Sequence, residues 1–101
     1  MKSIIEGLDK AFDNRIRIGI MAILVVNDWV DFNTLKSLLQ ATDGNLATHL
    51  FALEQIEYIF VKKEFVGRKT KTSYQITTKG KDAFTMHLNT LEDLFKNVKT
   101  N

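Results

Sequence analysis

The sequence contains no cysteine and no proline, and only five of its 101 residues are glycine. The absence of cysteine excludes disulfides, thiolate catalysis and cysteine-ligated zinc. Without proline, the boundaries between elements must be inferred from glycine, asparagine, aspartate and threonine. Repeats and low-complexity tracts are also missing, so we expect a single domain that spans residues 1–101 and carries the whole function.

A strong excess of charge and long apolar runs are missing as well. The 14 Lys and Arg residues against 12 Asp and Glu give a net charge of +2, so a nucleic-acid surface would require uneven placement of charge. The longest apolar run, "IGIMAILVV", is shorter than the roughly 20 residues of a membrane span. The start "MKSIIEGLDK" lacks the apolar region of a secretion signal. We therefore expect a cytoplasmic protein without a membrane segment.

What the chain does contain is helical spacing, beginning at its N-terminal end. Ile5, Leu8 and Phe12 recur at this spacing and predict a first helix, which Asp13 and Asn14 interrupt. Residues 15–26 then form a helix that is apolar on nearly every face and must be covered on all sides. The alternation in "RIRI" leaves a strand as the alternative for its first residues.

The middle of the chain predicts a short strand, a short helix, a tight turn and a second helix. Residues 30–32 are extended, and Asn33 is the expected cap of a helix that turns Leu35, Leu38 and Leu39 inward. Asp43 is the expected cap of the next helix, at about residues 44–57, whose inward residues are Leu46, Leu50 and Leu53. This order is the helix-turn-helix signature, which is only moderately specific alone.

Two β-rich runs and a long helix follow. Residues 58–66 and 70–77 predict a hairpin with a basic tip at residues 67–69, so residues 58–77 form a wing. Thr77 is the expected cap of a C-terminal helix over about residues 78–98. The predicted fold class is α+β, mainly α: a winged helix-turn-helix with additional helices at both chain ends.

The stretches "RIRIGIMAIL", "LLQATDGNLATHLFALEQIEYI", "FVGRKTKTSYQIT" and "TTKGKDAF" resemble winged-helix transcriptional regulators related to the MarR and ArsR families. The similarity covers most of the chain and is strongest to a compact subgroup with a "TDGNL…HL…FVGR" pattern. It implies a homodimeric DNA-binding regulator whose recognition helix begins at Gly44 and whose wing tip is residues 67–71. Where that family usually has glycine at the end of the recognition helix, this chain has Glu57.

DNA contact is expected from the recognition helix in the major groove and from the wing on phosphates or the minor groove. Gly44 would let phosphates approach the backbone, and Asn45 and Thr48 would hydrogen-bond base edges. Phe51 points outward on the same face and fits either thymine methyl groups or a protein partner. The candidate DNA-binding residues are Thr42, Asp43, Gly44, Asn45, Ala47, Thr48, Phe51, Lys62, Lys63, Arg68, Lys69 and Lys71. The alternative function is a protein-interaction winged helix that binds no DNA.

The two chain ends carry more apolar residues than so small a domain can readily cover. The C-terminal helix has a two-heptad apolar seam, and the N-terminal stripe adds to it. We expect a homodimer built from Ile5, Leu8, Phe12, Phe84, Leu88, Leu91, Phe95 and Val98. Two-fold symmetry then predicts a palindromic or near-palindromic double-stranded DNA site.

Nothing in the sequence indicates catalysis, a metal or a cofactor. His49 and His87 are the only histidines, and a metal sensor needs several ligands converging on one site. His49 is expected beside the core stripe or near DNA, and His87 at an interface or on the surface. No nucleophile with a base and no phosphate-binding glycine loop is present, so we expect no enzymatic activity and no cofactor. Any small-molecule effector is left open.

Overall fold

The computed structural model describes residues 3–97, and their element order is that of a winged helix-turn-helix. The elements are the 3-10 helix η1 (Lys10–Phe12), α1 (Arg15–Val25), β1 (Val30–Asp31), α2 (Phe32–Leu39), α3 (Asp43–Gln55), β2 (Ile59–Val66), β3 (Lys69–Ile76) and α4 (Thr78–Asn97). The predicted mainly helical α+β fold with a hairpin wing is therefore confirmed.

The predicted N-terminal helix is wrong, because η1 is the only helical element before α1 in the described residues. The Asp9 side chain accepts a hydrogen bond from the Ala11 amide and so starts η1, and residues 4–7 before it form turns. Gly7 lies directly against Thr90 of α4, and a Cβ at this glycine would overlap Thr90 Oγ1. The N-terminal segment therefore follows the surface of α4 and does not form a helix of its own.

The N-caps of α2 and α3, the two helices of the helix-turn-helix, lie one or two residues earlier than the sequence predicted. Asp31, not Asn33, caps α2 by accepting from the Thr34 amide, so Phe32 belongs to the helix. Thr42, not Asp43, caps α3 by accepting from the Asn45 amide at 3.2 Å. The two helices are joined through Gln40, which has a left-handed φ of 50°. Serine, threonine, asparagine and aspartate all cap helices, so their order alone did not distinguish neighbours.

The three strands form one antiparallel sheet in the order β1-β3-β2. Val66 pairs with Lys69, so the hairpin loop consists of Gly67 and Arg68 alone. Gly67 has a φ of 67°, and a positive φ at the first loop residue is the pattern of a type II′ turn, which glycine adopts without strain.

The core lies between α1, α2, α3, the base of the sheet and the start of α4. Its buried apolar residues are Phe12, Ile20, Met21, Leu24, Val30, Leu35, Leu46, Leu50, Leu53, Ile59, Tyr74 and Phe84. Leu38, which was predicted to point inward, is 63 % exposed. The buried stripe of α3 leaves the opposite face of this helix in solvent.

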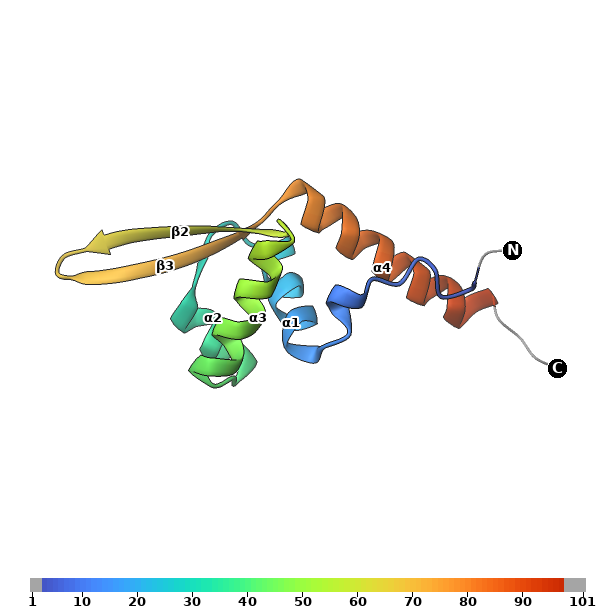
Figure 1. Ribbon diagram of the computed structural model, residues 1–101, viewed down its shortest axis with the longest axis horizontal. Coiled ribbons are helices and arrows are strands. Elements are labelled where there is room, and N and C mark those ends of the chain that lie inside the picture. The colour runs from blue at the N-terminus through green and yellow to red at the C-terminus, as the bar shows by residue number, and fades with distance from the viewer. Residues whose placement is uncertain (1–2, 98–101) are drawn as a thin grey trace.

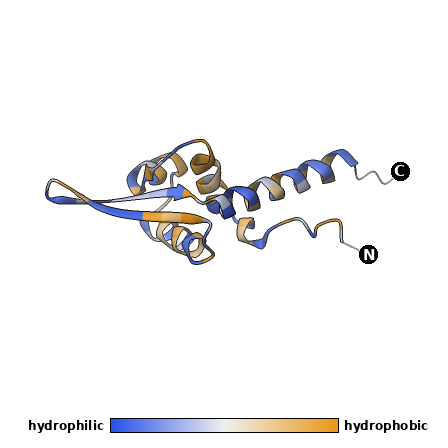
Figure 2. Ribbon diagram, turned by 90° about the horizontal axis from the view of Figure 1, so that it is seen from above, coloured by the Kyte–Doolittle hydropathy of each residue, from blue (hydrophilic) through white to orange (hydrophobic). Residues whose placement is uncertain are grey.

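The hairpin and α4 project from this core in opposite directions (Figure 1), giving a longest dimension of 62 Å. Seen from above, the N-terminal segment runs on the same side as α4, away from the wing (Figure 2). The molecule therefore has the wing at one end, both chain ends at the other, and α3 at the centre.

Candidate nucleic-acid interface

The start of α3 is open to solvent. All the predicted contact residues of this helix are exposed: Thr42, Asp43, Gly44, Asn45, Ala47, Thr48 and Phe51. The side chain of Asp43 pairs with Lys36 Nζ at 2.8 Å, so its carboxylate is engaged within the helix-turn-helix. A negative charge at this position is also stabilised by the positive end of the helix dipole.

Gly44 is not required by the packing of the protein. A Cβ built on this residue meets no atom within 4 Å among the described residues outside its own immediate helical backbone and chain neighbours. Its φ is not in the left-handed region. The open space above Gly44 is therefore available to a ligand that approaches the first turn of the helix.

Thr48 differs from the prediction in how its side chain is used. Its hydroxyl donates a hydrogen bond to the Gly44 carbonyl oxygen at 2.8 Å. A threonine hydroxyl has one hydrogen to donate, so in this conformation Thr48 cannot donate to a base edge. Asn45 and Thr48 are thus not equivalent as readers of DNA.

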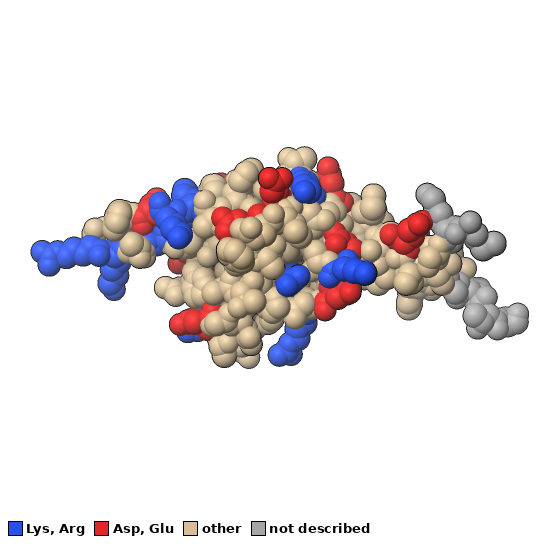
Figure 3. Space-filling view, in the orientation of Figure 1, with Lys and Arg blue, Asp and Glu red and all other residues tan. Residues whose placement is uncertain are grey.

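The wing places its basic side chains on two faces. The strand register puts Lys62 opposite Ser73, Glu64 opposite Lys71, and Val66 opposite Lys69, and these pairs share one face because side chains alternate along a strand. Lys63 lies on the other face, which continues the buried side of the sheet. Lysines and arginines gather at the wing end of the molecule (Figure 3).

Lys62 lies closer to the core than the other basic residues of the wing. Its Nζ is 4.3 Å from the centre of the Trp29 ring, a cation–π contact that partly occupies its charge. Arg68, Lys69 and Lys71 are exposed nearer the tip. The structure therefore separates a free basic tip from Lys62, a distinction that the spacing of lysines did not reveal.

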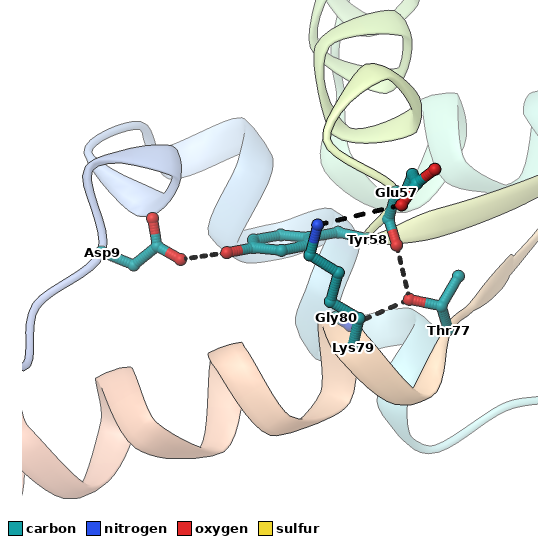
Figure 4. A network of polar contacts seen from close by, with 6 residues as sticks. All are labelled: Asp9, Glu57, Tyr58, Thr77, Lys79 and Gly80. Carbon is teal, nitrogen blue, oxygen red and sulfur yellow. Dashed lines mark hydrogen bonds and ion pairs between the residues drawn. The ribbon is translucent and has the colours of Figure 1, made fainter.

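The C-terminal end of α3 is joined by polar contacts to Asp9 in the N-terminal segment and to the start of α4 (Figure 4). The amides of Glu57 and Tyr58 bond the carbonyls of Glu54 and Leu53, each at 2.9 Å, which is a Schellman closure with Glu57 left-handed at φ 63°. Glu57 therefore adopts a left-handed conformation that glycine adopts without strain at the end of a helix.

Side chains of Thr77 and Tyr58 attach this end of α3 to α4 and to the N-terminal segment. The Thr77 hydroxyl donates to the Glu57 carbonyl at 2.7 Å and accepts from the Gly80 amide at 2.9 Å, so the predicted Thr77 cap of α4 is confirmed. The Tyr58 hydroxyl donates to Asp9 Oδ2 at 2.5 Å. Burial, with Asp9 adding to it, raises the pKa of Tyr58 to about 12.

The two histidines both act as hydrogen-bond acceptors within the protein. His87, which was predicted at an interface or on the surface, is buried, and its Nδ1 accepts from the Asp9 amide at 3.0 Å. His49 is half-buried beside the core, and its Nδ1 accepts from Arg17 Nε at 3.0 Å. Burial, together with the nearby Arg17 charge, lowers the pKa of His49. Neither long-range pairing left a local signal in the sequence.

The predicted dimer residues divide into two groups. The prediction is wrong for Phe12 and Phe84. Their rings pack against each other in the core, with centroids 5.3 Å apart, so they are not available to a partner. Leu8 is half-buried, and Val98 lies outside the described residues. The exposed members are Ile5, Leu88, Leu91 and Phe95.

Two further features are missing from residues 3–97. No three histidine, aspartate or glutamate side chains of this part of the chain come together as metal ligands would. None of its helices combines the length and apolar composition needed to cross a lipid bilayer.

Comparison with known proteins agrees with this architecture. A family model described as "Winged helix DNA-binding domain" matches residues 16–95. An uncharacterized protein of Methanocaldococcus jannaschii, MJ0432, is 37% identical over 90 residues, which are 89% of this chain and 98% of that protein.

Solved structures with the same fold include several transcriptional regulators. A transcriptional regulator homologue from Pyrococcus horikoshii OT3 superposes with a TM-score of 0.82 at 24% identity, over 96% of this chain and 94% of that one. MarR superposes with a TM-score of 0.73 at 17% identity, over 91% and 69%. PadR of Bacillus subtilis, in complex with operator DNA, gives 0.63 at 16% identity, over 87% and 50%. At these identities the likeness establishes the fold.

Proposed function

The chain belongs to the winged helix DNA-binding domain family, and we propose that it is a transcriptional regulator that binds a specific double-stranded DNA site as a homodimer. The observation that carries this proposal is the pairing of an uncovered outer face on α3 with a basic hairpin tip. PadR, which has the same fold, was solved with operator DNA, and this supports DNA as the partner here.

The two DNA-facing elements have different tasks in the proposed complex. The exposed first turns of α3 enter the major groove, where Asn45 can hydrogen-bond a base edge and the open space at Gly44 admits a phosphate. Arg68 and Lys69 at the wing tip meet phosphates or the adjacent minor groove. Base contacts give specificity, whereas wing contacts give affinity that depends on salt.

The proposed dimer uses the end of the molecule opposite the wing. There Phe95 is 91 % exposed, and Leu88, Leu91 and Ile5 are also uncovered. Apolar side chains gathered on one surface commonly mark an interface. A two-fold dimer through this end presents two copies of α3 to one duplex, and successive major grooves lie about 34 Å apart, so the preferred site is a palindrome or near-palindrome.

A mobility shift with the full chain tests the proposal. We expect random-sequence duplex to bind at low salt, and duplexes selected from a randomised library to contain an inverted repeat and to bind more tightly. The exposed Phe51 also suits the alternative, a protein-interaction module. Failure to bind any duplex, even at low salt, would favour that alternative. The proposed activity is binding without a catalytic step, in the cytoplasm.

A further inference from the structure

The outer face of α3 offers apolar groups where a DNA-reading helix would offer hydrogen-bond donors. Ala47, Thr48 and Phe51 are all exposed, and their spacing of one and four residues places them on one side of the helix. Phe51 is 61 % exposed, although phenylalanine is among the residues most often buried. We call these three residues the apolar strip.

Thr48 belongs to this strip because of how its hydroxyl is used. The hydroxyl donates to the Gly44 carbonyl oxygen at 2.8 Å, so its only hydrogen is directed back along the helix. Thymine O4, guanine O6 and the purine N7 atoms are acceptors and need a donor. What Thr48 can still present to such a base edge is its methyl group.

We propose that the apolar strip reads the 5-methyl groups of thymines in the major groove, so that the preferred DNA site has thymines at these positions. Thymine is the one standard base with a methyl group in that groove, and alanine, the threonine methyl and phenylalanine are the side chains that contact it. This inference rests on the proposed DNA-binding function and adds which base chemistry the helix recognises.

The surroundings of the strip favour DNA over a protein partner. The strip consists of two methyl groups and one ring, and polar residues flank it: Asn45 on the first turn and Gln55 on the last. Protein interfaces have a larger apolar centre. The strip also shares its helix with the open first turn at Gly44 and belongs to the same chain as the basic wing, which complements a polyanion.

Replacement of thymine by deoxyuridine tests the inference, because it removes the methyl group and nothing else. The full chain first selects duplexes from a randomised library, and each thymine of the selected half-site is then replaced singly. We expect wild-type affinity to fall about fourfold at one or more positions, the worth of one buried methyl group. Uniform tight binding of all uridine duplexes would overturn the inference while leaving the proposed function intact.

Variants assign the effect to the strip. Phe51→Ala should bind the thymine and uridine duplexes equally at its position, whereas Phe60→Ala, which truncates a phenylalanine that is 54 % exposed on β2, should keep the wild-type ratio. Thr48→Val retains a methyl group and should keep discrimination at the position that Thr48 reads, and Thr48→Ser should lose it. The reverse result for this pair would mean that the hydroxyl reads the base, and would contradict the proposed role of Thr48.

The outcomes separate failure of this inference from failure of the proposed function. A protein that selects and binds a duplex but ignores thymine methyl groups contradicts only the inference. A Phe51→Ala variant with unchanged discrimination would exclude Phe51 from the strip's proposed role. A chain that binds no duplex at low salt contradicts both, and then Phe51 is better explained as part of a protein-docking surface.

Discussion

Gly44 and Gly80 occupy opposite environments, although both lie in the first turn of a helix. The space next to Gly44 is open, whereas a Cβ at Gly80 would overlap the Tyr58 carbonyl oxygen, which belongs to the backbone and cannot rotate away. Gly80 therefore allows α4 to pack against the end of α3. Gly44 has no such packing role within the described residues, so the open space next to it is available to a ligand.

Gly44→Ala should stabilise the free protein and weaken DNA binding. Alanine is favoured over glycine in a helix by about 0.5 to 1 kcal/mol, and at Gly44 the extra methyl meets nothing in the protein. In the proposed complex the same methyl obstructs a phosphate. Urea unfolding and DNA titration measure the two effects. Gly80→Ala is the control and should destabilise by about 1 to 3 kcal/mol through overpacking. Unchanged DNA affinity for Gly44→Ala would exclude close phosphate contact at this position.

Glu57→Gly should raise the free energy of unfolding by about 1 kcal/mol, since it relieves a left-handed conformation that is costly for residues with a Cβ. The φ of Glu57 is 63°. The ion pair that this change removes, with Lys79 at 3.9 Å, lies on the exposed surface and contributes little. Urea unfolding at neutral pH measures the difference. Glu57→Ala retains the strained backbone without the carboxylate and should show no such gain. A destabilised glycine variant would mean that the carboxylate matters more than the backbone.

The raised pKa of Tyr58 predicts a loss of stability at alkaline pH. Burial and Asp9 favour the neutral phenol in the folded state and raise its pKa from 10.0 to about 12. Stability from this group is therefore fully present below pH 10 and is lost as the pH rises toward 12. Burial raises the pKa of Tyr74 as well, so Tyr58→Phe should reduce the loss and not abolish it. The measurement is urea unfolding between these pH values, and an unchanged pH profile for Tyr58→Phe would contradict it.

At the scale of elements, what could be predicted from the sequence depended on local signals. The helix-turn-helix, the wing and α4 have periodic apolar residues and turn formers at their ends, and these signals act over a few neighbouring residues. The N-terminal stripe had helical spacing too, but Gly7 packs on Thr90 and Asp9 starts η1. Contacts that distant cannot be derived from spacing.

The same reason explains the errors in the candidate site. Periodicity identified Phe12 and Phe84 as apolar, but it could not show that one chain brings both into a single core. Exposure of the α3 face followed from the stripe Leu46, Leu50 and Leu53. The engagement of the Thr48 hydroxyl depends on a side-chain rotamer, which the pattern does not specify.

The wing and α3 should respond differently to mutation. Arg68→Ala and Lys69→Ala remove exposed charges at the wing tip, and we expect each to weaken specific and random duplex alike. Removal of one phosphate interaction should lower the slope of log affinity against log salt by about one unit, or about two per dimer. Asn45→Ala should instead cost about 1 to 3 kcal/mol per base contact on the selected duplex, with little loss on random DNA.

Lys62→Ala is the matched control for the wing, because its ammonium lies over Trp29 at 4.3 Å and not at the tip. It should change the salt slope least. If Arg68→Ala, Lys69→Ala and Asn45→Ala all leave both kinds of binding unchanged, the proposed DNA surface is wrong.

At the scale of the whole molecule, hydrogen bonds join the N-terminal segment both to α4 and to the C-terminal end of α3. Asp9 accepts from Tyr58, at the end of α3, and its amide donates to His87 in α4. The exposed apolar residues of the N-terminal segment and α4 therefore belong to segments that are hydrogen-bonded to each other and, through Asp9, to Tyr58 at the end of α3. A dimer formed through those ends would orient the two copies of α3 through a small number of specific contacts.

Leu91→Glu should dissociate the proposed dimer. In a single chain Leu91 is 44 % exposed, so a glutamate there stays hydrated, whereas in the dimer it buries an unpaired charge. We expect the dissociation constant of the dimer to rise on the order of 100-fold or more, measured by sedimentation or light scattering. Asn89→Glu adds the same charge to the exposed far side of α4, 200° away around the helix axis at about 100° per residue, and should leave the dimer intact. The Leu91 variant should also lose affinity for a palindromic duplex while a single half-site binds as before, because each chain keeps its own α3 and wing. A wild-type protein with the mass of a monomer, or a Leu91 variant that remains dimeric, would show that the interface is not on this surface.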